Sequence, residues 1–256
     1  MTPQLVILDL DGTVHRDGMP TFGAVDALCE IQRLGIQIRF LSNNSTIDPR
    51  LKALELAAFG IRCEPEWIAT PCVTAARVLR EGQARNVFVV GEHALRTAIE
   101  AAGMTVATEE NAVRGEADAV VLGLMRDATF QTLRAASRAV CEGATFVATN
   151  ADKSFPVEQG RQDPGAGALL AFVEAASGRR ALVIGKPSPT MVYEAMAAAG
   201  VGADRTIMVG DRLDTDIAAG LAAGTRTWLV LTGVEHQIPP GQAGSEDLRG
   251  LLSLWD

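Results

Sequence analysis

The sequence is poor in histidine, tyrosine and basic residues, and it contains no long hydrophobic run. No apolar stretch approaches the roughly 20 residues of a membrane-spanning helix, and the first residues lead into a strand-like segment rather than a signal peptide. The 256 residues include 23 Lys and Arg but 31 Asp and Glu, so the formal net charge is −8. We therefore expect neither nucleic-acid nor membrane binding, because a basic surface for phosphate groups is lacking. A small phosphorylated ligand remains compatible with this charge, since it needs only one local site.

Cysteine and histidine are few, and neither type is clustered. The sequence has no C-x-x-C pair and no histidine at metal-ligand spacing among Cys29, Cys63, Cys72, Cys141, His15, His93 and His236. We expect reduced thiols in a cytoplasmic protein and no zinc site.

The dominant pattern is a short apolar strand followed by an Ala/Leu-rich helix. Apolar runs predict strands over residues 5–8, 36–41, 87–90, 119–124, 145–148, 181–184, 206–209 and 227–231. Helical patterns cover residues 25–34, 49–59, 73–79, 95–102, 130–141, 166–176, 189–199 and 217–223, and the Gly/Pro-rich stretch 156–167 predicts an irregular loop. Continuous apolar strands indicate helices on both faces of a sheet. The alternation predicts an α/β fold with largely parallel sheets, in one large or two modest domains.

Two acidic clusters directly follow predicted strands. Asp9 and Asp11 come after the run 5–8, and Asp211 and Asp216 come after the run 206–209. In open α/β sheets, ligands bind outside the carboxyl ends of the strands. Carboxylates gathered there repel one another unless a cation lies among them, and Mg²⁺ prefers oxygen ligands. The clusters predict a magnesium site for a phosphorylated substrate, whereas the alternative interpretation is acidic residues that only form turns.

Two other strand ends carry groups suited to phosphate. Ser42 and Asn43 follow the run 36–41 and offer a hydroxyl, an amide and backbone N–H groups. Lys186 follows the run 181–184 and offers a compact positive charge. Taken singly, each segment is explained as well by a polar turn or an exposed lysine.

Four segments resemble, in order, the four motifs of the haloacid dehalogenase (HAD) superfamily of phosphatases. They are Asp9-Leu10-Asp11-Gly12-Thr13, Ser42-Asn43-Asn44, Gly185-Lys186-Pro187, and Gly210-Asp211 with Asp216. The insertion between the second and third motifs resembles the class II cap of the NagD-like and p-nitrophenylphosphatase-like branch. The segments similar to that branch's cap signature are Thr149-Asn150-Ala151-Asp152, Pro156, Gly160 and Pro164-Gly165-Ala166-Gly167. The resemblance covers essentially the whole chain and implies a Rossmann-like parallel-sheet HAD core with an inserted α/β cap domain.

The resemblance implies that the acidic residues carry the chemistry. Asp9 would be the nucleophile that attacks phosphorus and forms an aspartyl-phosphate, and Asp11 would act as general acid and base. Mg²⁺ would be bound by Asp9, by the backbone carbonyl of Asp11 and by Asp211. Asp216 would orient those ligands or a metal-bound water.

The remaining motif residues would hold the substrate. Ser42 and Lys186 would bind the transferring phosphoryl oxygens, and Lys186 would also offset the charge of the nucleophile Asp9. Asn43 would assist through its backbone N–H. Asn150 and Asp152 are the candidate contacts to the leaving group, with loop capping as the alternative.

The same resemblance divides the chain. The core would comprise residues 1–81 plus 179–256, and the inserted cap would comprise residues 82–178. A cap of this kind implies small phosphorylated metabolites as substrates. It leaves the oligomeric state open, with a homodimer through the cap as one option. The motifs leave nucleoside monophosphates, glycerol phosphate, phosphoglycolate and sugar phosphates open.

Three other functions are consistent with parts of the pattern. A receiver-type signalling protein also gathers acidic residues, a lysine and Mg²⁺ around a phosphorylated aspartate, but Asp11 and the long insertion disfavour it. A phosphotransferase or phosphomutase would keep the fold and transfer phosphate between alcohols. A binding protein that has lost turnover is disfavoured by the intact pair of Asp9 and Asp11.

Overall fold

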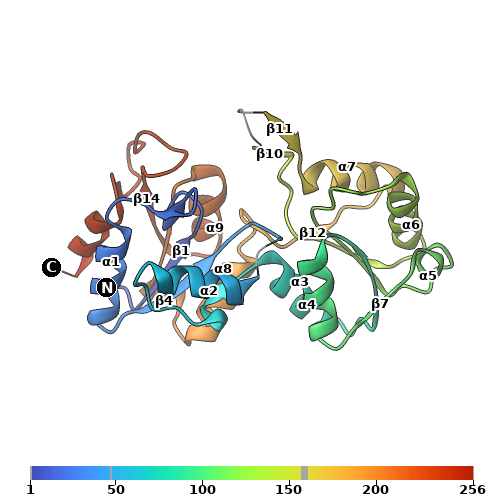
Figure 1. Cartoon of the computed structure of the whole chain (residues 1–256), viewed down its shortest axis with the longest axis horizontal. Helices are drawn as coiled ribbons and strands as arrows, with labels where there is room; N and C mark the ends of the chain where they lie inside the picture. Colours follow the sequence, from blue (N-terminus) through green and yellow to red (C-terminus); the bar gives the residue numbers. More distant parts are fainter. Residues whose placement is uncertain (1, 47, 157–160, 256) are drawn as a thin grey trace. The chain divides into compact units, whose positions relative to one another are not determined.

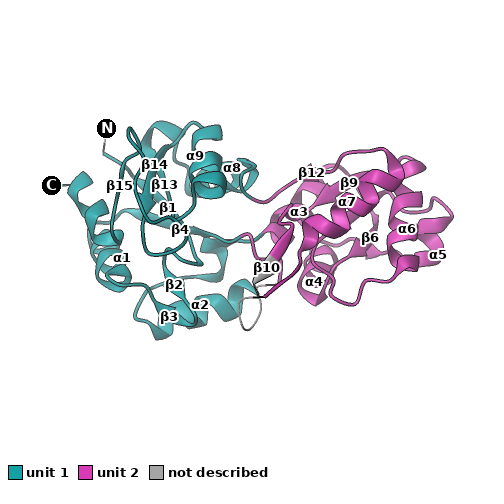
Figure 2. Ribbon diagram, turned by 90° about the horizontal axis from the view of Figure 1, so that it is seen from above, with its two compact units in different colours: residues 1–42, 48–70, 186–256 teal, residues 43–47, 71–185 magenta. Residues whose placement is uncertain are grey.

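The structure, a computed structural model, describes residues 2–46, 48–156 and 161–255 (Figure 1). The chain forms two compact units (Figure 2). The first unit contains residues 1–42, 48–70 and 186–256, and the second contains residues 43–47 and 71–185. Each unit is built on its own parallel sheet. Among the described residues, no helix is long and apolar enough to cross a membrane.

The first unit contains a six-stranded sheet in the order β15-β14-β13-β1-β4-β5, and every neighbouring pair is parallel. Its strands are β1 (Leu5–Asp9), β4 (Gln37–Leu41), β5 (Ile68–Ala69), β13 (Thr206–Gly210), β14 (Arg226–Val230) and β15 (Gly244–Ser245). The central strands β1 and β13 are buried at every position, which explains why both are continuous apolar runs in the sequence. A separate hairpin pairs β2 (His15–Arg16) with β3 (Met19–Pro20).

Helices pack against this sheet and complete its core. They are α1 (Ala24–Arg33), α2 (Pro49–Ala58), η1 (Pro65–Trp67), α8 (Thr190–Ala199), η3 (Ala203–Arg205), η4 (Leu213–Ile217), α9 (Ala218–Ala222) and η5 (Leu248–Leu254). Helix α8 packs on β1 and β4, and α9 packs on β14. Helix α2 begins at a clear start signal, because the Asp48 side chain accepts from the Arg50 N–H and a proline occupies the first turn.

The second unit contains a five-stranded parallel sheet in the order β12-β9-β8-β6-β7. Its strands are β6 (Asn86–Val90), β7 (Thr105–Val106), β8 (Ala119–Leu122), β9 (Thr145–Ala148) and β12 (Leu182–Val183). Its helices are α3 (Pro71–Glu81), α4 (His93–Ala101), α5 (Glu109–Val113), α6 (Phe130–Cys141) and α7 (Ala166–Ser177). Buried residues from β6, β8, β9 and the helices α5, α6 and α7 form its hydrophobic core.

The α/β class with parallel sheets is confirmed, but two details differ from the sequence-based prediction. The units divide at residues 70/71 and 185/186 rather than at 81/82 and 178/179. The reason is packing, because α3 contacts α4 and β12 pairs with β9 of the second sheet. The stretch 156–167, predicted as an irregular loop, includes β11 (Gln162–Pro164), which pairs antiparallel with β10 (Ser154–Pro156). Gly160 of the predicted cap signature lies outside the described residues.

Candidate active site

The first unit brings its acidic motifs together around one buried lysine. Asp9 is the last residue of β1, and Asp216 lies in the π-helical turn η4 that follows β13. The Lys186 ammonium forms an ion pair with Asp9 and lies 2.6 Å from Asp216 Oδ1. All three side chains are almost completely buried. The predicted exposed-lysine alternative is therefore wrong, because Lys186 is only 4 % exposed.

Burial and like charges shape the ionisation of this cluster. Burial raises the pKa of the Asp9 carboxyl well above its usual value, Asp216 and Asp211 raise it further, and Lys186 opposes them. Burial also disfavours the Lys186 charge, but Asp216 and Asp9 outweigh it and hold the pKa of the ammonium above its usual value. Lys186 therefore stays charged, and additional positive charge would stabilise the ionised form of Asp9.

Asp211 is held by the loop that follows β14. Its Oδ2 accepts a hydrogen bond of 2.7 Å from the Val234 N–H, and its backbone carbonyl accepts one of 3.2 Å from Glu235 N–H. Its Oδ1 is buried and has no hydrogen-bond partner among the described residues. Burial raises the pKa of Asp211, and the charge of Asp216 adds to that increase. Such an unpaired buried oxygen is unfavourable unless a cation or another donor satisfies it.

Two glycines allow the acidic groups to approach this closely. A Cβ at Gly12, whose φ is +90°, would lie 2.6 Å from Asp211 Oδ2. A Cβ at Gly210 would lie 2.2 Å from the Asp216 Cβ. Larger residues at either position would push the carboxylates apart, and this explains the glycines in the first and fourth motifs.

The oxygen atoms of this cluster fit a hard divalent cation. Asp9, Asp211 and Asp216 each offer an oxygen, and these oxygens lie within 4.8 Å of one another. The donor set contains only oxygen, which suits Mg²⁺ rather than zinc. Asp211 Oδ1 has no hydrogen-bond partner among the described residues, whereas Asp9 and Asp216 both pair with Lys186, and Asp216 also accepts from the Arg212 N–H at 3.1 Å. Asp211 is therefore the best placed of the three to contact a metal, and Asp9 and Asp216 each offer an oxygen to the same site.

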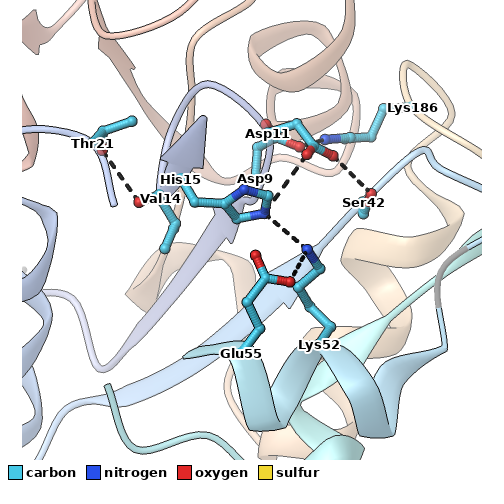
Figure 3. A network of polar contacts seen from close by, with 9 residues as sticks. All are labelled: Asp9, Asp11, Val14, His15, Thr21, Ser42, Lys52, Glu55 and Lys186. Atoms are coloured by element: carbon cyan, nitrogen blue, oxygen red, sulfur yellow. Dashed lines mark hydrogen bonds and ion pairs between the residues drawn. The ribbon is translucent and has the colours of Figure 1, made fainter. Parts of the chain in front are cut away.

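Asp11 lies beside Asp9 and Lys186 in the same site (Figure 3). Its side chain is 59 % exposed, and its Oδ2 accepts a hydrogen bond of 3.4 Å from the Ser42 hydroxyl. Ser42 itself is fully buried at the end of β4. The hydroxyl, Lys186 and the two carboxylates of Asp9 and Asp11 thus converge at the carboxyl ends of β1 and β4, as the sequence predicted.

A set of polar residues beside Asp11 was not found from the sequence. His15 Nε2 lies 3.6 Å from Asp11 Oδ1 and 3.3 Å from Lys52 Nζ, and Lys52 donates a 2.7 Å hydrogen bond to Glu55 (Figure 3). Burial lowers the pKa of His15, and the charge of Lys52 lowers it further. The carboxylates of Asp11 and Glu55 raise the pKa, but they do not outweigh these two effects. The sequence shows that His15 follows Asp11 by four residues. It does not show the turn that brings the two together or the contact of His15 with Lys52 on α2.

The other predicted contacts belong to the second unit. Asn150 is buried, and its Nδ2 donates a 2.8 Å hydrogen bond to the Asn43 backbone carbonyl. Its Oδ1 has no hydrogen-bond partner among the described residues. Asp152 is exposed, and its backbone carbonyl accepts from the Gly167 N–H at 2.9 Å. The contact of Asn150 and Asp152 with substrate stays a prediction.

Replacing Asn150 with alanine should destabilise the second unit. The substitution removes the hydrogen bond that the Asn150 amide donates to the Asn43 carbonyl, and losing a buried hydrogen bond costs about 1–3 kcal/mol. The thermal midpoint should fall by about 2–4 °C for each kcal/mol. Lys153→Ala is the matched control, because Lys153 is an exposed residue of the same loop. Equal midpoints for the two variants would show that the Asn150 hydrogen bond contributes nothing.

Comparison with known proteins shows which family this chain is similar to. The family described as haloacid dehalogenase-like hydrolase matches residues 6–105, and a second HAD-hydrolase-like family matches residues 183–245. The 5'-nucleotidase YutF of Bacillus subtilis is 34% identical over 89% of this chain and 87% of its own length. The sugar-phosphatase AraL of the same organism is 35% identical over 93% of this chain and 86% of its own length. The structure of a p-nitrophenyl phosphatase from Archaeoglobus fulgidus superposes with a TM-score of 0.90, at 31% identity and 99% coverage of both chains.

Proposed function

The chain belongs to the haloacid dehalogenase-like hydrolases and is a phosphoric monoester hydrolase, and we propose that it is Mg²⁺-dependent and forms an aspartyl-phosphate on Asp9. The observation that carries this proposal is the buried cluster of Lys186, Asp9 and Asp211. In it, a charged lysine touches the proposed nucleophile, and Asp211 presents an unpaired buried oxygen. A turn with a purely structural role would not be expected to contain this buried ion pair or this unpaired oxygen, because burying charge costs free energy.

The positions of the side chains support the first half of the proposed reaction. An Asp9 oxygen bonds to phosphorus while the bond between phosphorus and the leaving oxygen breaks, and Asp11 supplies the proton to that oxygen. Lys186 reduces the repulsion between the Asp9 carboxylate and the anionic phosphoryl group. Mg²⁺ bound by Asp9 and Asp211 would neutralise charge on the phosphoryl oxygens. Ser42 would donate its hydroxyl to one of those oxygens, with Asn43 assisting through its backbone N–H.

The second half releases inorganic phosphate. A water oxygen bonds to phosphorus as the bond to Asp9 breaks, and the water proton passes to Asp11, which is thereby returned to its starting state. The exposed position of Asp11 suits this exchange, because the alcohol can leave to solvent beside it and water can enter from solvent in its place.

We propose small phosphorylated metabolites as the substrate class. The two relatives are named for different leaving groups, a nucleoside and a sugar, although both are similar to this chain to nearly the same degree. The phosphoryl site described above binds only the group that these substrates share. The choice among leaving groups is therefore expected to depend on residues outside the four motifs.

A phosphate-release assay tests this function. Purified protein should release inorganic phosphate from p-nitrophenyl phosphate and from a subset of sugar phosphates and nucleoside monophosphates, and it should stop when EDTA removes the metal. Conversion of one sugar phosphate into another without free phosphate would contradict hydrolysis and favour a phosphomutase. Stable phosphorylation of the protein without turnover would favour a receiver-like role.

We also propose a cytoplasmic location. The four cysteines are free thiols, as is usual where glutathione keeps proteins reduced. A homodimer through the second unit stays a prediction.

Asp211→Asn should raise the Mg²⁺ concentration needed for half-maximal activity by about 10–100-fold, because it removes one negative charge while keeping the side-chain shape. A Mg²⁺ titration of p-nitrophenyl phosphate hydrolysis measures this effect. Asp214→Asn is the matched control, since Asp214 lies in the same motif but is exposed and paired with Arg212 at 2.9 Å. An unchanged titration for Asp211→Asn would remove Asp211 from the metal site.

A further inference from the structure

The turn after β1 folds back on itself and places His15 beside Asp11. The Val14 and His15 N–H groups donate to the Leu10 carbonyl at 2.9 and 3.1 Å, and the Gly12 N–H donates to the His15 carbonyl at 2.8 Å. These bonds bring two residues that are four positions apart in sequence into a bridge. The exposed carboxylate of Asp11 therefore has a buried imidazole as its neighbour, because the His15 side chain is only 6 % exposed.

The His15 side chain makes its polar contacts with described residues through a single atom. Nε2 faces both Asp11 Oδ1 at 3.6 Å and Lys52 Nζ at 3.3 Å. Nδ1 is buried and has no hydrogen-bond partner among the described residues. A hydrocarbon side chain would fill this space without leaving a buried nitrogen unpaired, which costs free energy. The placement of a histidine here therefore points to the contact made by Nε2 rather than to packing.

Lys52 comes from another element and is itself fixed. It lies on α2, and Glu55 accepts its 2.7 Å hydrogen bond one helical turn further along. Three consecutive contacts thus run from Glu55 through Lys52 and His15 to the Asp11 carboxylate (Figure 3). His15, the last residue in this series of contacts, lies near Oδ1 of Asp11, whereas the Ser42 hydroxyl contacts Oδ2.

We propose that His15 and Lys52 are positioning residues that hold the Asp11 carboxyl in the orientation needed for proton transfer to the leaving oxygen. The inference rests on the proposed function, because it assumes that Asp11 is the general acid. In that step the proton on Asp11 moves to the leaving oxygen as the bond between phosphorus and that oxygen breaks, and the Asp9–phosphorus bond forms. An exposed carboxyl without these neighbours has several side-chain orientations, and only some of them point at the leaving oxygen.

The leaving group provides a test that separates positioning from general damage. p-Nitrophenolate is stable as an anion and needs little help from an acid, whereas the alkoxide of glycerol phosphate must be protonated as it leaves. The ratio of kcat/KM for glycerol phosphate to kcat/KM for p-nitrophenyl phosphate therefore reports on the acid. A disturbance of the fold or of the phosphoryl site lowers both values together.

The experiment measures this ratio, with Mg²⁺ in excess, for the wild type, His15→Phe, His15→Gln, Lys52→Met and Asp11→Asn. Phenylalanine keeps the bulk of the ring without its nitrogens, and methionine keeps the Lys52 stem without its charge. We expect Asp11→Asn to lower the ratio by about 100-fold, and His15→Phe and Lys52→Met to lower it by about tenfold. His15→Gln should recover part of the loss, because its amide can reach the position of Nε2.

The outcomes separate this inference from the proposed function. An unchanged ratio in His15→Phe and Lys52→Met, with a lowered ratio in Asp11→Asn, overturns the positioning role and leaves the phosphatase intact. An unchanged ratio in Asp11→Asn overturns the role of Asp11, and the inference with it. If His15→Phe does not fold, the Lys52→Met ratio decides alone, because that substitution changes only the end of a side chain on α2.

Discussion

Asp9→Asn should lower kcat by about 10⁴-fold or more, because an amide oxygen is too weak a nucleophile to attack phosphorus. The substitution preserves the shape of the side chain and still offers an oxygen to Lys186, which keeps its second partner Asp216 at 2.6 Å. We therefore expect a folded protein whose thermal midpoint stays close to that of the wild type. Phosphate release from p-nitrophenyl phosphate measures the loss of activity.

Asp17→Asn is the matched control for this substitution. Asp17 is an exposed residue of the turn between β2 and β3, eight positions after Asp9. Its substitution replaces a carboxylate by an amide in the same way. Its kcat should equal that of the wild type. A second measurement traps the intermediate, since acid-quenched wild-type protein should carry phosphate on Asp9 whereas Asp9→Asn should carry none. Robust hydrolysis by Asp9→Asn would rule out the aspartyl-phosphate.

Lys186→Met should lower both activity and stability by large factors. The ammonium is the positive charge that Asp9 and Asp216 share in the described structure, and both carboxylates are buried. Breaking a buried ion pair by removing one partner costs about 3–5 kcal/mol, because the other charge is left uncompensated. The loss of one charge that stabilises the transferring phosphoryl group should lower kcat by about 10²–10³-fold.

Thermal unfolding with EDTA present measures the stability effect, since bound Mg²⁺ would otherwise offset part of it. The double variant Lys186→Met with Asp216→Asn should recover part of the lost stability, because it removes one of the two uncompensated carboxylates. The activity should stay low in the double variant. A thermal midpoint for Lys186→Met equal to that of the wild type would show that the ion pairs contribute nothing to the fold.

The sequence was informative wherever a local pattern determined the outcome. The apolar runs of β1 and β13 identified buried parallel strands, because helices cover both faces of such a sheet. Asp9 and Asp211 were placed correctly at the ends of these strands, since the carboxyl ends of parallel strands meet at one edge. The cluster of Asp9, Asp211 and Asp216 follows directly from that rule together with the pairing of β1 and β13.

Contacts that depend on packing between distant segments were not determined in this way. The sequence analysis assigned the strand before Lys186 to the core. That strand is β12, and it pairs with β9 of the second sheet, so its correct assignment required knowledge of the strand pairing. The resemblance implied that the lysine holds phosphate and offsets the charge of Asp9, which lies 177 positions away, and only the structure shows that it also pairs with Asp216. The hydrogen bond between Asn150 and Asn43 spans 107 positions and has no local signal at all.

The sequence by itself therefore determined the family and the parallel α/β architecture, and it predicted the residues of the proposed reaction. These depend on motifs of a few residues and on burial patterns that repeat along one strand or helix. The tertiary structure decided which groups neutralise which charges: Lys186 between two carboxylates, Asp211 with one oxygen unpaired, and His15 between Asp11 and Lys52. The reason is that a side chain's electrostatic environment is set by residues from every element packed around it, and those elements meet only when the chain folds.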